Sequence, residues 1–491
     1  MLYIRWKEVD WALARSKILK WQQEIYLASK LGNIKKVRKY QKCIMRSIDA
    51  KLLAVRVVTQ NIDFVNNFNL ISPEDKVFLA LSLVINIKSC YIHRLFISKR
   101  RKLKNRRLRI SMIRHYSLQA LFKLALEPEW EAKFQANSYG FRPGRDCHDA
   151  VFAIQSFVQN QPVYVLNAHI LKCFDNINHE KLLDKIGMTG KYRKQLRFWL
   201  KSEVFVDPVD SDGILYMPSR LAVYGIFPLL LNIVLDGIDQ FINSLIKDLR
   251  LYGLSYKRFN QSSISKSFSF VRYAYHFVVM HNDLSVISLI YNNLLEFLRG
   301  VGLELNSIDT RIIHTLKIND VTKEFCSILN IKPGFSFLGF YFRQYFVIHN
   351  SIYTISKQVL GFRTVIIPSK EQINSHQKNL HNLVLKQGKH MSQDRLIKKL
   401  NLLIHSWSNY FGKSDYSIIR LLRKMDYLLY LKLRQWAKRR YKTFGKGIFL
   451  FRKVGAKKWT FATDTEILLR HIDYFYPLNL YIKLKGQSNS Y

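Results

Sequence analysis

The chain has 491 residues and a formal net charge of +43, because 78 lysines and arginines stand against 35 acidic residues. With 48 % hydrophobic residues, it has apolar material for roughly two to four folded domains, which excludes a disordered basic tail. A surface of this charge repels itself unless polyanions neutralise it, so the composition indicates a partner with a phosphate backbone. We find no apolar run of about 18 residues or more that could span a bilayer, and we expect no membrane partner.

Cysteine and histidine form no recognisable metal-binding spacing. The five cysteines are scattered and none forms a Cys-x-x-Cys pair, which argues against zinc or a disulfide framework and fits a reducing compartment. The N-terminus lacks the apolar core of a signal peptide, and it is not the acid-free stretch of a transit peptide. The chain is rich in Lys, Ile, Asn, Leu and Tyr, as AT-rich coding sequence yields, and this indicates an organelle-encoded protein.

Residues 12–58 are predicted to form a helical hairpin, because apolar residues recur there at helical spacing. Gly32 and Asn33 mark the break between its two arms. The arms carry many cations, which form either an ordinary solvated face or an arm that faces RNA, and the high net charge favours the second. These cations are Lys30, Lys35, Lys36, Arg38, Lys39, Lys42 and Arg46.

The densest run of cations, eight in eleven positions, lies at residues 99–109. Such a run is typical of a phosphate contact or of a flexible tail. Because it lies between apolar segments, we expect a loop or a strand edge that faces nucleic acid. Its members are Lys99, Arg100, Arg101, Lys102, Lys104, Arg106, Arg107 and Arg109.

Residues 110–345 alternate short β-like runs with helical ones, which is typical of an α+β core. The strands are expected at 163–170, 270–280 and 335–342, and the helices at 118–126 and 284–298. Residues 371–442 are then expected to be mainly helical.

A second basic region, between residues 431 and 460, has eleven cations and no acid. Aromatic residues are interleaved with the cations. Cations bind phosphates while aromatic faces stack on unpaired bases, which is how looped or single-stranded RNA is bound. Alternatively, the aromatic residues form a small core under a basic surface. The cations are Lys432, Arg434, Lys438, Arg439, Arg440, Lys442, Lys446, Arg452, Lys453, Lys457 and Lys458, and the aromatic residues are Trp436, Tyr441, Phe444, Phe449, Phe451 and Trp459.

Residues 270–279 place two apolar runs around a tight turn, Tyr273-Ala274-Tyr275-His276. The turn resembles the active-site hairpin of reverse transcriptases, which reads Tyr-Ala-Asp-Asp. Two-metal nucleotidyl transfer needs carboxylates there, because they hold two Mg²⁺ ions about 3.5–4 Å apart. A phenol and an imidazole are poor substitutes. The turn therefore predicts the frame of a polymerase without its chemistry.

A longer string, from Ala125 to Arg145, closely resembles the second sequence block of group II intron reverse transcriptases, also called maturases. Shorter matches extend the resemblance over nearly the whole chain; they include 303–306, 337–340, 400–410 and 451–455. The resemblance implies an α+β fold, with reverse-transcriptase-like fingers and palm, a helical N-terminal extension, and a mainly α-helical thumb and maturase domain X. The implied domains are residues 1–65, 66–345 and 346–491.

The departures from the family pattern fall where the chemistry would be. The resemblance places metal ligands at His169, Tyr275 and His276, and none of these is a carboxylate. Asp175 is retained, but we expect it to cap the next helix rather than to bind a metal. Two histidines without a carboxylate or a cysteine also make a poor transition-metal set. We therefore predict no catalytic residue, no metal site and no protein-bound cofactor.

The resemblance implies a degenerate maturase that binds group II intron RNA, in intron-containing pre-mRNA, and promotes splicing by stabilising the active RNA fold. The Mg²⁺ of such a complex would belong to the RNA. Two alternatives stay open: an active RNA-directed DNA polymerase of a mobile intron, and a general RNA-binding splicing factor. We expect an organelle, with the plastid (chloroplast) favoured over the mitochondrion, and a homodimer is left open. Nothing after Gly486 could supply a nuclease, so we expect no DNA cleavage.

The residues expected to contact RNA come from the basic regions above and from the glycine-rich loop of the long string, from which Arg142 and Arg145 project. They are Lys35, Lys36, Arg38, Lys39, Arg100, Arg101, Arg106, Arg107, Arg142, Arg145, Lys432, Arg434, Trp436, Lys438, Arg439, Arg440, Arg452, Lys453, Lys457 and Lys458.

Overall fold

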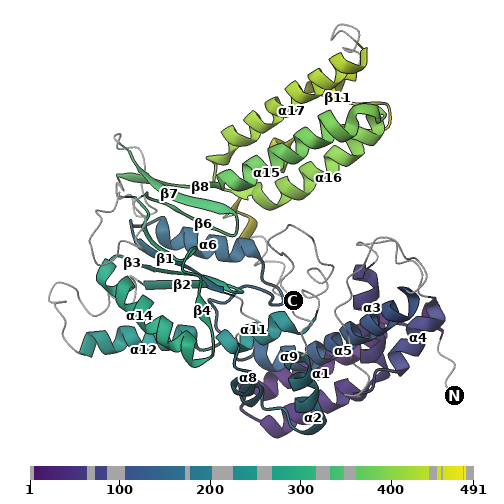
Figure 1. Cartoon of the computed structure of the whole chain (residues 1–491), viewed down its shortest axis with the longest axis vertical. Helices are drawn as coiled ribbons and strands as arrows, with labels where there is room; N and C mark the ends of the chain where they lie inside the picture. The colour runs from purple at the N-terminus through teal and green to yellow at the C-terminus, as the bar shows by residue number, and fades with distance from the viewer. Residues whose placement is uncertain are drawn as a thin grey trace.

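The computed structural model forms three regions: N-terminal helices, a central sheet with helices beside it, and a C-terminal helical bundle (Figure 1). The arrangement confirms the predicted α+β fold. The structure describes residues 5–62, 72–85, 105–171, 177–201, 225–251, 268–316, 332–347, 361–441, 450–454, 457–478 and 480–482.

The N-terminal region begins with a short turn, η1 (Trp6–Glu8), followed by α1 (Trp11–Lys30) and α2 (Ile34–Arg46). The predicted break at Gly32 is correct, because that glycine adopts φ +69° and the side chain of Asn33 caps α2. The predicted second arm is wrong in one respect. It is two helices, because the chain is extended at Ser47 and resumes as α3 (Ile48–Ile62).

The long helix α5 (Asn105–Glu131) packs against α1, α2 and α3, and α4 (Pro73–Leu81) packs on α3. The first turns of α5 contain Arg106, Arg107 and Arg109, so the expectation of a loop or strand edge is wrong for these three residues. The rest of the basic run, 99–104, lies outside the described residues. The predicted helix at 118–126 is the middle of α5.

The central sheet is antiparallel in the order β2-β3-β1-β4, and β5 also pairs with β1. The β-like run at 270–280 is the predicted hairpin of two strands, and Ala274 adopts φ +56° at its turn. The strands are β1 (Tyr164–Leu171), β2 (Phe268–Tyr273), β3 (His276–His281), β4 (Glu304–Leu305) and β5 (Arg311–His314). The helices of this region are α6 (Cys147–Val158), α8 (His179–Ile186), α9 (Gly190–Lys201), α11 (Phe227–Leu235), α12 (Ile238–Leu251) and α14 (Leu284–Gly300).

A second sheet, in the order β6-β7-β8, lies between the central sheet and the C-terminal bundle (Figure 1). The predicted strand at 335–342 is another hairpin, with Leu338 and Gly339 at positive φ. The bundle confirms the mainly helical prediction for 371–442. The remaining elements are β6 (Phe335–Phe337), β7 (Phe340–Phe346), β8 (Phe362–Pro368), α15 (Lys370–His381), η4 (Asn382–Lys386), η5 (Gln387–His390), α16 (Gln393–Phe411), β9 (Lys413–Ser414), α17 (Ile418–Tyr441), β10 (Phe451–Val454), β11 (Lys457–Phe461), η7 (His471–Tyr474) and β12 (Tyr476–Pro477).

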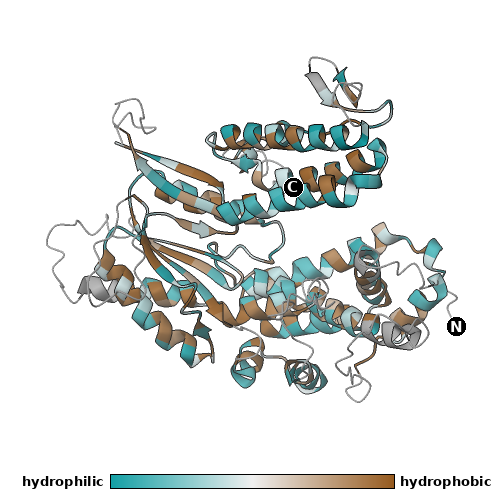
Figure 2. Ribbon diagram, turned by 45° about the horizontal axis from the view of Figure 1, so that its top comes forward, coloured by the Kyte–Doolittle hydropathy of each residue, from teal (hydrophilic) through white to brown (hydrophobic). Residues whose placement is uncertain are grey.

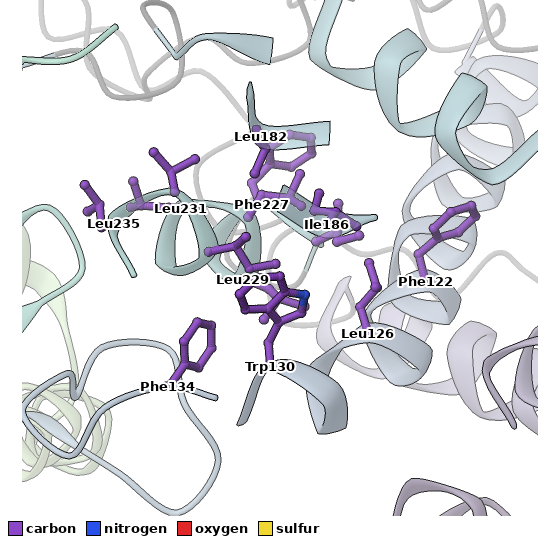
Figure 3. Close-up of a cluster of buried hydrophobic side chains, with 14 of the residues drawn as sticks. Phe122, Leu126, Trp130, Phe134, Leu182, Ile186, Phe227, Leu229, Leu231 and Leu235 are labelled. Carbon is purple, nitrogen blue, oxygen red and sulfur yellow. The ribbon is translucent and has the colours of Figure 1, made fainter. Parts of the chain in front are cut away.

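The hydrophobic core follows these regions only in part. The bundle has a core of its own, and α6 shares another with the two sheets. The largest core joins α1–α3 to α5, α8 and α11, and Figure 3 shows a part of it, where Trp130 of α5 lies beside Leu229 of α11. The predicted domain boundaries stay predictions, and the one at residue 65 does not coincide with a division of this core.

Figure 2 shows the brown, apolar stretches concentrated on the sheet and on the inner sides of helices. One segment, Phe227–Ile246, is long and apolar enough to cross a membrane by length and composition alone. In the structure, 61 % of it is buried and it forms two helices, α11 and α12, broken at Gly237. It is therefore weak evidence for a membrane span, because a core helix of a globular protein meets the same criteria.

Candidate nucleic-acid interface

The three positions where the sequence pattern expects metal ligands lie together. His169 on β1 pairs directly with His276 on β3, and Tyr275 lies in the turn that precedes β3. The rings of His169 and Tyr275 have centroids 6.4 Å apart. The frame of a two-metal site is therefore present, and its three side chains are two imidazoles and a phenol.

The two imidazoles are stacked, with ring centroids 3.6 Å apart and planes 26° apart. The Nε2 of His276 lies 2.6 Å from Oδ1 of Asn167, whose amide in turn donates to the carbonyl of Ser336. Burial lowers the pKa of His276 well below its usual value, and burial also lowers the pKa of His169, opposed by Asp309. Both rings are neutral at pH 7, and nitrogen ligands in this arrangement do not replace the oxygen ligands that Mg²⁺ prefers.

On its other side, the turn is held by a buried arginine. Arg272 donates from Nη1 to Oδ1 of Asn232 and to the carbonyl of Ala274, and from Nη2 to Oγ of Ser138. Asn232 uses its amide nitrogen to donate to the carbonyl of Gly140. We call Ser138, Gly140, Asn232 and Arg272 the turn clamp, because together they fix the turn to the loop of the long string.

Gly140 is required by the closeness of the turn. A Cβ at this position would lie 2.4 Å from the backbone nitrogen of Ala274, which is closer than atoms can approach. Backbone hydrogen bonds join the same two segments: the N–H of Tyr139 donates to the carbonyl of Arg272, and the N–H of Arg272 donates to the carbonyl of Asn137. The long string therefore shapes the turn directly.

The charge of Arg272 is balanced at a distance. Burial lowers the pKa of Arg272 to about 10, while the carboxylates of Asp239 and Asp236 oppose that shift. Burial raises the pKa of Asp239 to about 6. Nε of Arg272 and Oδ2 of Asp239 are buried and have no hydrogen-bond partner among the described residues. This unusual network was missed in the sequence, where the only sign of it is an arginine in an apolar strand.

Several predicted RNA contacts have structural roles. Arg38 donates to the buried carboxylate of Glu129 and to the carbonyl of Ile186. Arg142 is buried and forms a two-pronged ion pair with Glu131. Direct contact of these two arginines with RNA stays a prediction. Their guanidinium groups already bind partners within the protein, which argues against such a contact.

Two further residues of the predicted set are also committed within the protein. Arg145 donates to the carbonyls of Ala136 and Ser138. Trp436 is buried in the core of the bundle and its indole N–H donates to the carbonyl of Gly388. Its burial favours the alternative that the aromatic residues of this region form a core under the basic surface.

Other predicted contacts are exposed and can reach a polyanion. Some of them also have partners within the chain: Lys36 pairs with Glu24, Arg452 with Asp464, and Arg440 with the carbonyl of Met391. Lys432 is half-buried and donates to the side chain of Gln377. The exposed residues of the set include Lys35, Lys39, Arg434, Lys438, Arg439 and Lys453.

The remaining predicted positions are described only in part or not at all. Arg106 and Arg107 lie in α5, and Lys457 and Lys458 lie in β11, but their side chains are outside the description. Arg100 and Arg101 lie outside the described residues, as does Asp175. The prediction that Asp175 caps the next helix therefore stays a prediction, and α8 is capped by Asn178, which accepts from the N–H of Lys181.

A cluster that the sequence analysis missed is formed by Asp146, Cys147 and His148, whose possible ligand atoms lie within 4.8 Å of one another. Both oxygens of Asp146 are engaged, one at the N-terminus of α6 and one with the hydroxyl of Tyr481. Nε2 of His148 hydrogen-bonds to the carbonyl of Tyr410. These contacts join α6 to α16 and to the C-terminal segment, so we assign the cluster a structural role.

Three family models match the chain. The N-terminal domain of reverse transcriptase matches residues 6–76, the reverse transcriptase (RNA-dependent DNA polymerase) matches 97–342, and the group II intron maturase-specific domain matches 373–459. The order of these three parts agrees with the three regions of the fold. The chain therefore belongs to the reverse transcriptase family, among the group II intron maturases.

Relatives with known sequences agree with this assignment. The group II intron-encoded protein LtrA of Lactococcus lactis subsp. cremoris is 31 % identical over 31 % of this chain and 26 % of its own length. An uncharacterized 91 kDa protein in cob intron of Schizosaccharomyces pombe is 30 % identical over 32 % of this chain and 20 % of its own length. Maturase-like protein 1 of Euglena gracilis is 24 % identical over 86 % of this chain and 79 % of its own length. The chain thus spans about a quarter or less of the first two relatives.

Proposed function

We propose that this protein binds group II intron RNA and promotes its splicing by stabilising the active RNA fold, without polymerising DNA. The observation that carries the proposal is the stacked, neutral pair of His169 and His276 at the metal-ligand positions. A phosphoryl transfer that depends on two protein-held Mg²⁺ ions has no carboxylates at these positions to hold them. The chemistry of splicing and its Mg²⁺ would then belong to the RNA.

A polyanion partner is supported by the net charge of +43 and by the match to the maturase-specific domain. Lys438 and Arg439 are exposed in the last turn of α17, within that domain. Cations on a rigid helix end can bind phosphates without ordering a flexible chain, so their contribution to affinity is not reduced by a large entropy cost.

We also propose that the protein acts in an organelle, and in the plastid rather than the mitochondrion. The AT-rich composition supports an organelle-encoded gene, as do relatives named after introns of cob and COX1/OXI3. The preference for the plastid rests on the composition and on the resemblance alone. Fractionation of the source cells, followed by antibody detection, tests it.

The proposed function is tested by splicing of a group II intron precursor at a Mg²⁺ concentration too low for the RNA to splice alone. We expect spliced product only when the protein is added, and no product if an unrelated intron replaces the group II intron. Splicing that is unchanged by the protein would contradict the proposal. Broad crosslinking to unrelated transcripts would instead favour a general RNA-binding factor.

The polymerase alternative is tested by extension of a DNA primer on an RNA template. We expect no extension by the wild type. The triple variant His169→Asp, Tyr275→Asp and His276→Asp should not regain full activity. The resemblance implies glycine and proline in the segments 106–111 and 220–225, where this chain carries bulky residues. Metal-dependent extension by the wild type would overturn the proposal.

A further inference from the structure

Four aromatic side chains form a continuous series from the core to the surface at the former metal-ligand positions. The ring of Phe337 lies 4.3 Å from that of His276, His276 lies 3.6 Å from His169, and His169 lies 6.4 Å from Tyr275. Phe337 and His276 are buried, His169 is half-buried, and Tyr275 is 49 % exposed. We call these four residues the aromatic ladder.

The aromatic ladder ends on a rigid support. Tyr275 lies in a two-residue turn whose geometry is fixed by the positive φ of Ala274 and by the turn clamp. The carbonyl of Tyr275 also accepts a hydrogen bond from the N–H of Ile170 on β1. A ring displayed from a fixed backbone loses little conformational entropy when a ligand covers it.

The chemistry of the ladder differs from that of a metal site in its charge. Three carboxylates without bound metal would repel the phosphates of any RNA that lies over the turn. An imidazole is neutral or cationic, so His169 and His276 carry no negative charge in either protonation state. The former metal-ligand positions therefore present a half-exposed tyrosine side chain and no anionic group of their own.

We propose that Tyr275, whose ring centroid lies 6.4 Å from that of His169, stacks on one unpaired nucleobase of the bound RNA. The inference rests on the proposed function, because it takes the partner to be RNA. Every base has a π face, so a stacking platform of this kind holds a base at a fixed place with little dependence on its identity. It would position the RNA strand over the turn that no longer performs polymerisation.

The test compares Tyr275→Ala with Tyr275→Phe, because the second variant keeps the ring and removes only the hydroxyl. Two probes are used: a short single-stranded RNA of mixed sequence, and an oligomer of abasic riboses with the same phosphates. We expect Tyr275→Ala to weaken binding of the RNA roughly 5- to 100-fold, as for other base–aromatic contacts. Tyr275→Phe should bind like the wild type, and binding of the abasic oligomer should be the same for all three proteins.

Tyr345→Ala is a matched control, because this tyrosine is 42 % exposed on β7 of the other sheet. It should leave RNA binding unchanged, and circular dichroism should show that each variant is folded. The inference is overturned if Tyr275→Ala binds RNA as tightly as the wild type, or if it loses affinity for the abasic oligomer equally. If the wild type binds neither probe, the proposed function itself fails. If Tyr275→Ala keeps full RNA binding and loses only binding to another protein, the ring serves protein docking and the inference is wrong.

Discussion

The two sides of the β2–β3 turn are built with opposite chemistry. The turn clamp uses the charge of Arg272, buried and bound to three described partners, whereas the aromatic ladder uses neutral rings. A buried charge is tolerable only when its hydrogen bonds are present, so the clamp is sensitive to any change. Stacked rings tolerate substitution better. The comparison shows that the clamp that supports the turn is complete, whereas the side with the expected metal-ligand positions carries no carboxylate.

The variant Arg272→Met should have the largest effect, because it removes the central residue of the turn clamp. This variant removes the buried guanidinium and leaves Oδ1 of Asn232 and Oγ of Ser138 without their donor. We expect the free energy of unfolding to fall by about 2–6 kcal/mol, because each of these two buried acceptors left unsatisfied costs about 1–3 kcal/mol. Urea denaturation measures the change. Arg299→Met is the control, because this arginine is exposed in the last turn of α14, and an equally large decrease there would contradict the assignment.

A smaller effect on the same side is expected from Gly140→Ala. The added methyl group would meet the backbone of Ala274, which cannot move without disturbing the turn. Overpacking of this kind costs about 1–3 kcal/mol, and the thermal midpoint should fall accordingly. Gly300→Ala, where a Cβ would enter open space at the end of α14, should be nearly neutral. Equal midpoints for the two variants would show that the loop and the turn are not in close contact.

The sequence predicted the hairpin and the positions of His169, Tyr275 and His276 better than the turn clamp, for a physical reason. The apolar runs on both sides of Tyr273-Ala274 define two strands, and the pairing of His169 with His276 follows from the fold that the resemblance implies. The role of Arg272 depends on Ser138 and Asn232, which are far away in sequence, so no local pattern reports it.

Contacts between residues far apart in sequence also explain what the sequence did not show about Arg142, Trp436 and the basic run before residue 110. Arg142 and Trp436, both predicted to contact RNA, are buried because the fold brings their partners, Glu131 and Gly388, to them. The basic run before residue 110 was expected to be a loop or a strand edge because it lies between apolar segments. Arginine is a good helix former, and residues 105–109 instead extend the helix that the following apolar residues stabilise.

On the side of the aromatic ladder, the pH dependence of the free energy of unfolding tests whether His276 is held neutral. Burial lowers the pKa of His276, so the unfolded chain binds a proton below about pH 6.5 that the folded chain does not. Stability present above pH 6.5 is therefore lost as the pH falls, by about 1 kcal/mol per pH unit from this residue. His276→Phe should lose less stability than the wild type between pH 7 and pH 5 in denaturation experiments.

The control for this prediction is His390→Phe, because the side chain of His390 is exposed. Its pH dependence should match that of the wild type. His115 adds a contribution of the same sign in all three proteins, since burial lowers its pKa to about 4, and it cancels in the comparison. A pH profile of His276→Phe identical to that of the wild type would mean that the imidazole is not held neutral.

The smallest expected effect is on the salt dependence of RNA binding, when two exposed cations are removed. Lys438→Ala together with Arg439→Ala removes two exposed cations from the end of α17, so fold stability should barely change. Removing one phosphate-binding cation should lower the slope of log K against log salt by about 0.7–0.9, so the double variant should lower it by roughly 1.5 for RNA binding. Tyr275→Ala should weaken binding without changing this slope, because stacking releases no counterions. The charge-matched control is Lys191→Ala with Lys194→Ala, two exposed cations on α9. If both double variants lower the slope equally, binding depends on net charge rather than on α17, and the distinction between salt-dependent and salt-independent binding would rest on Tyr275 alone.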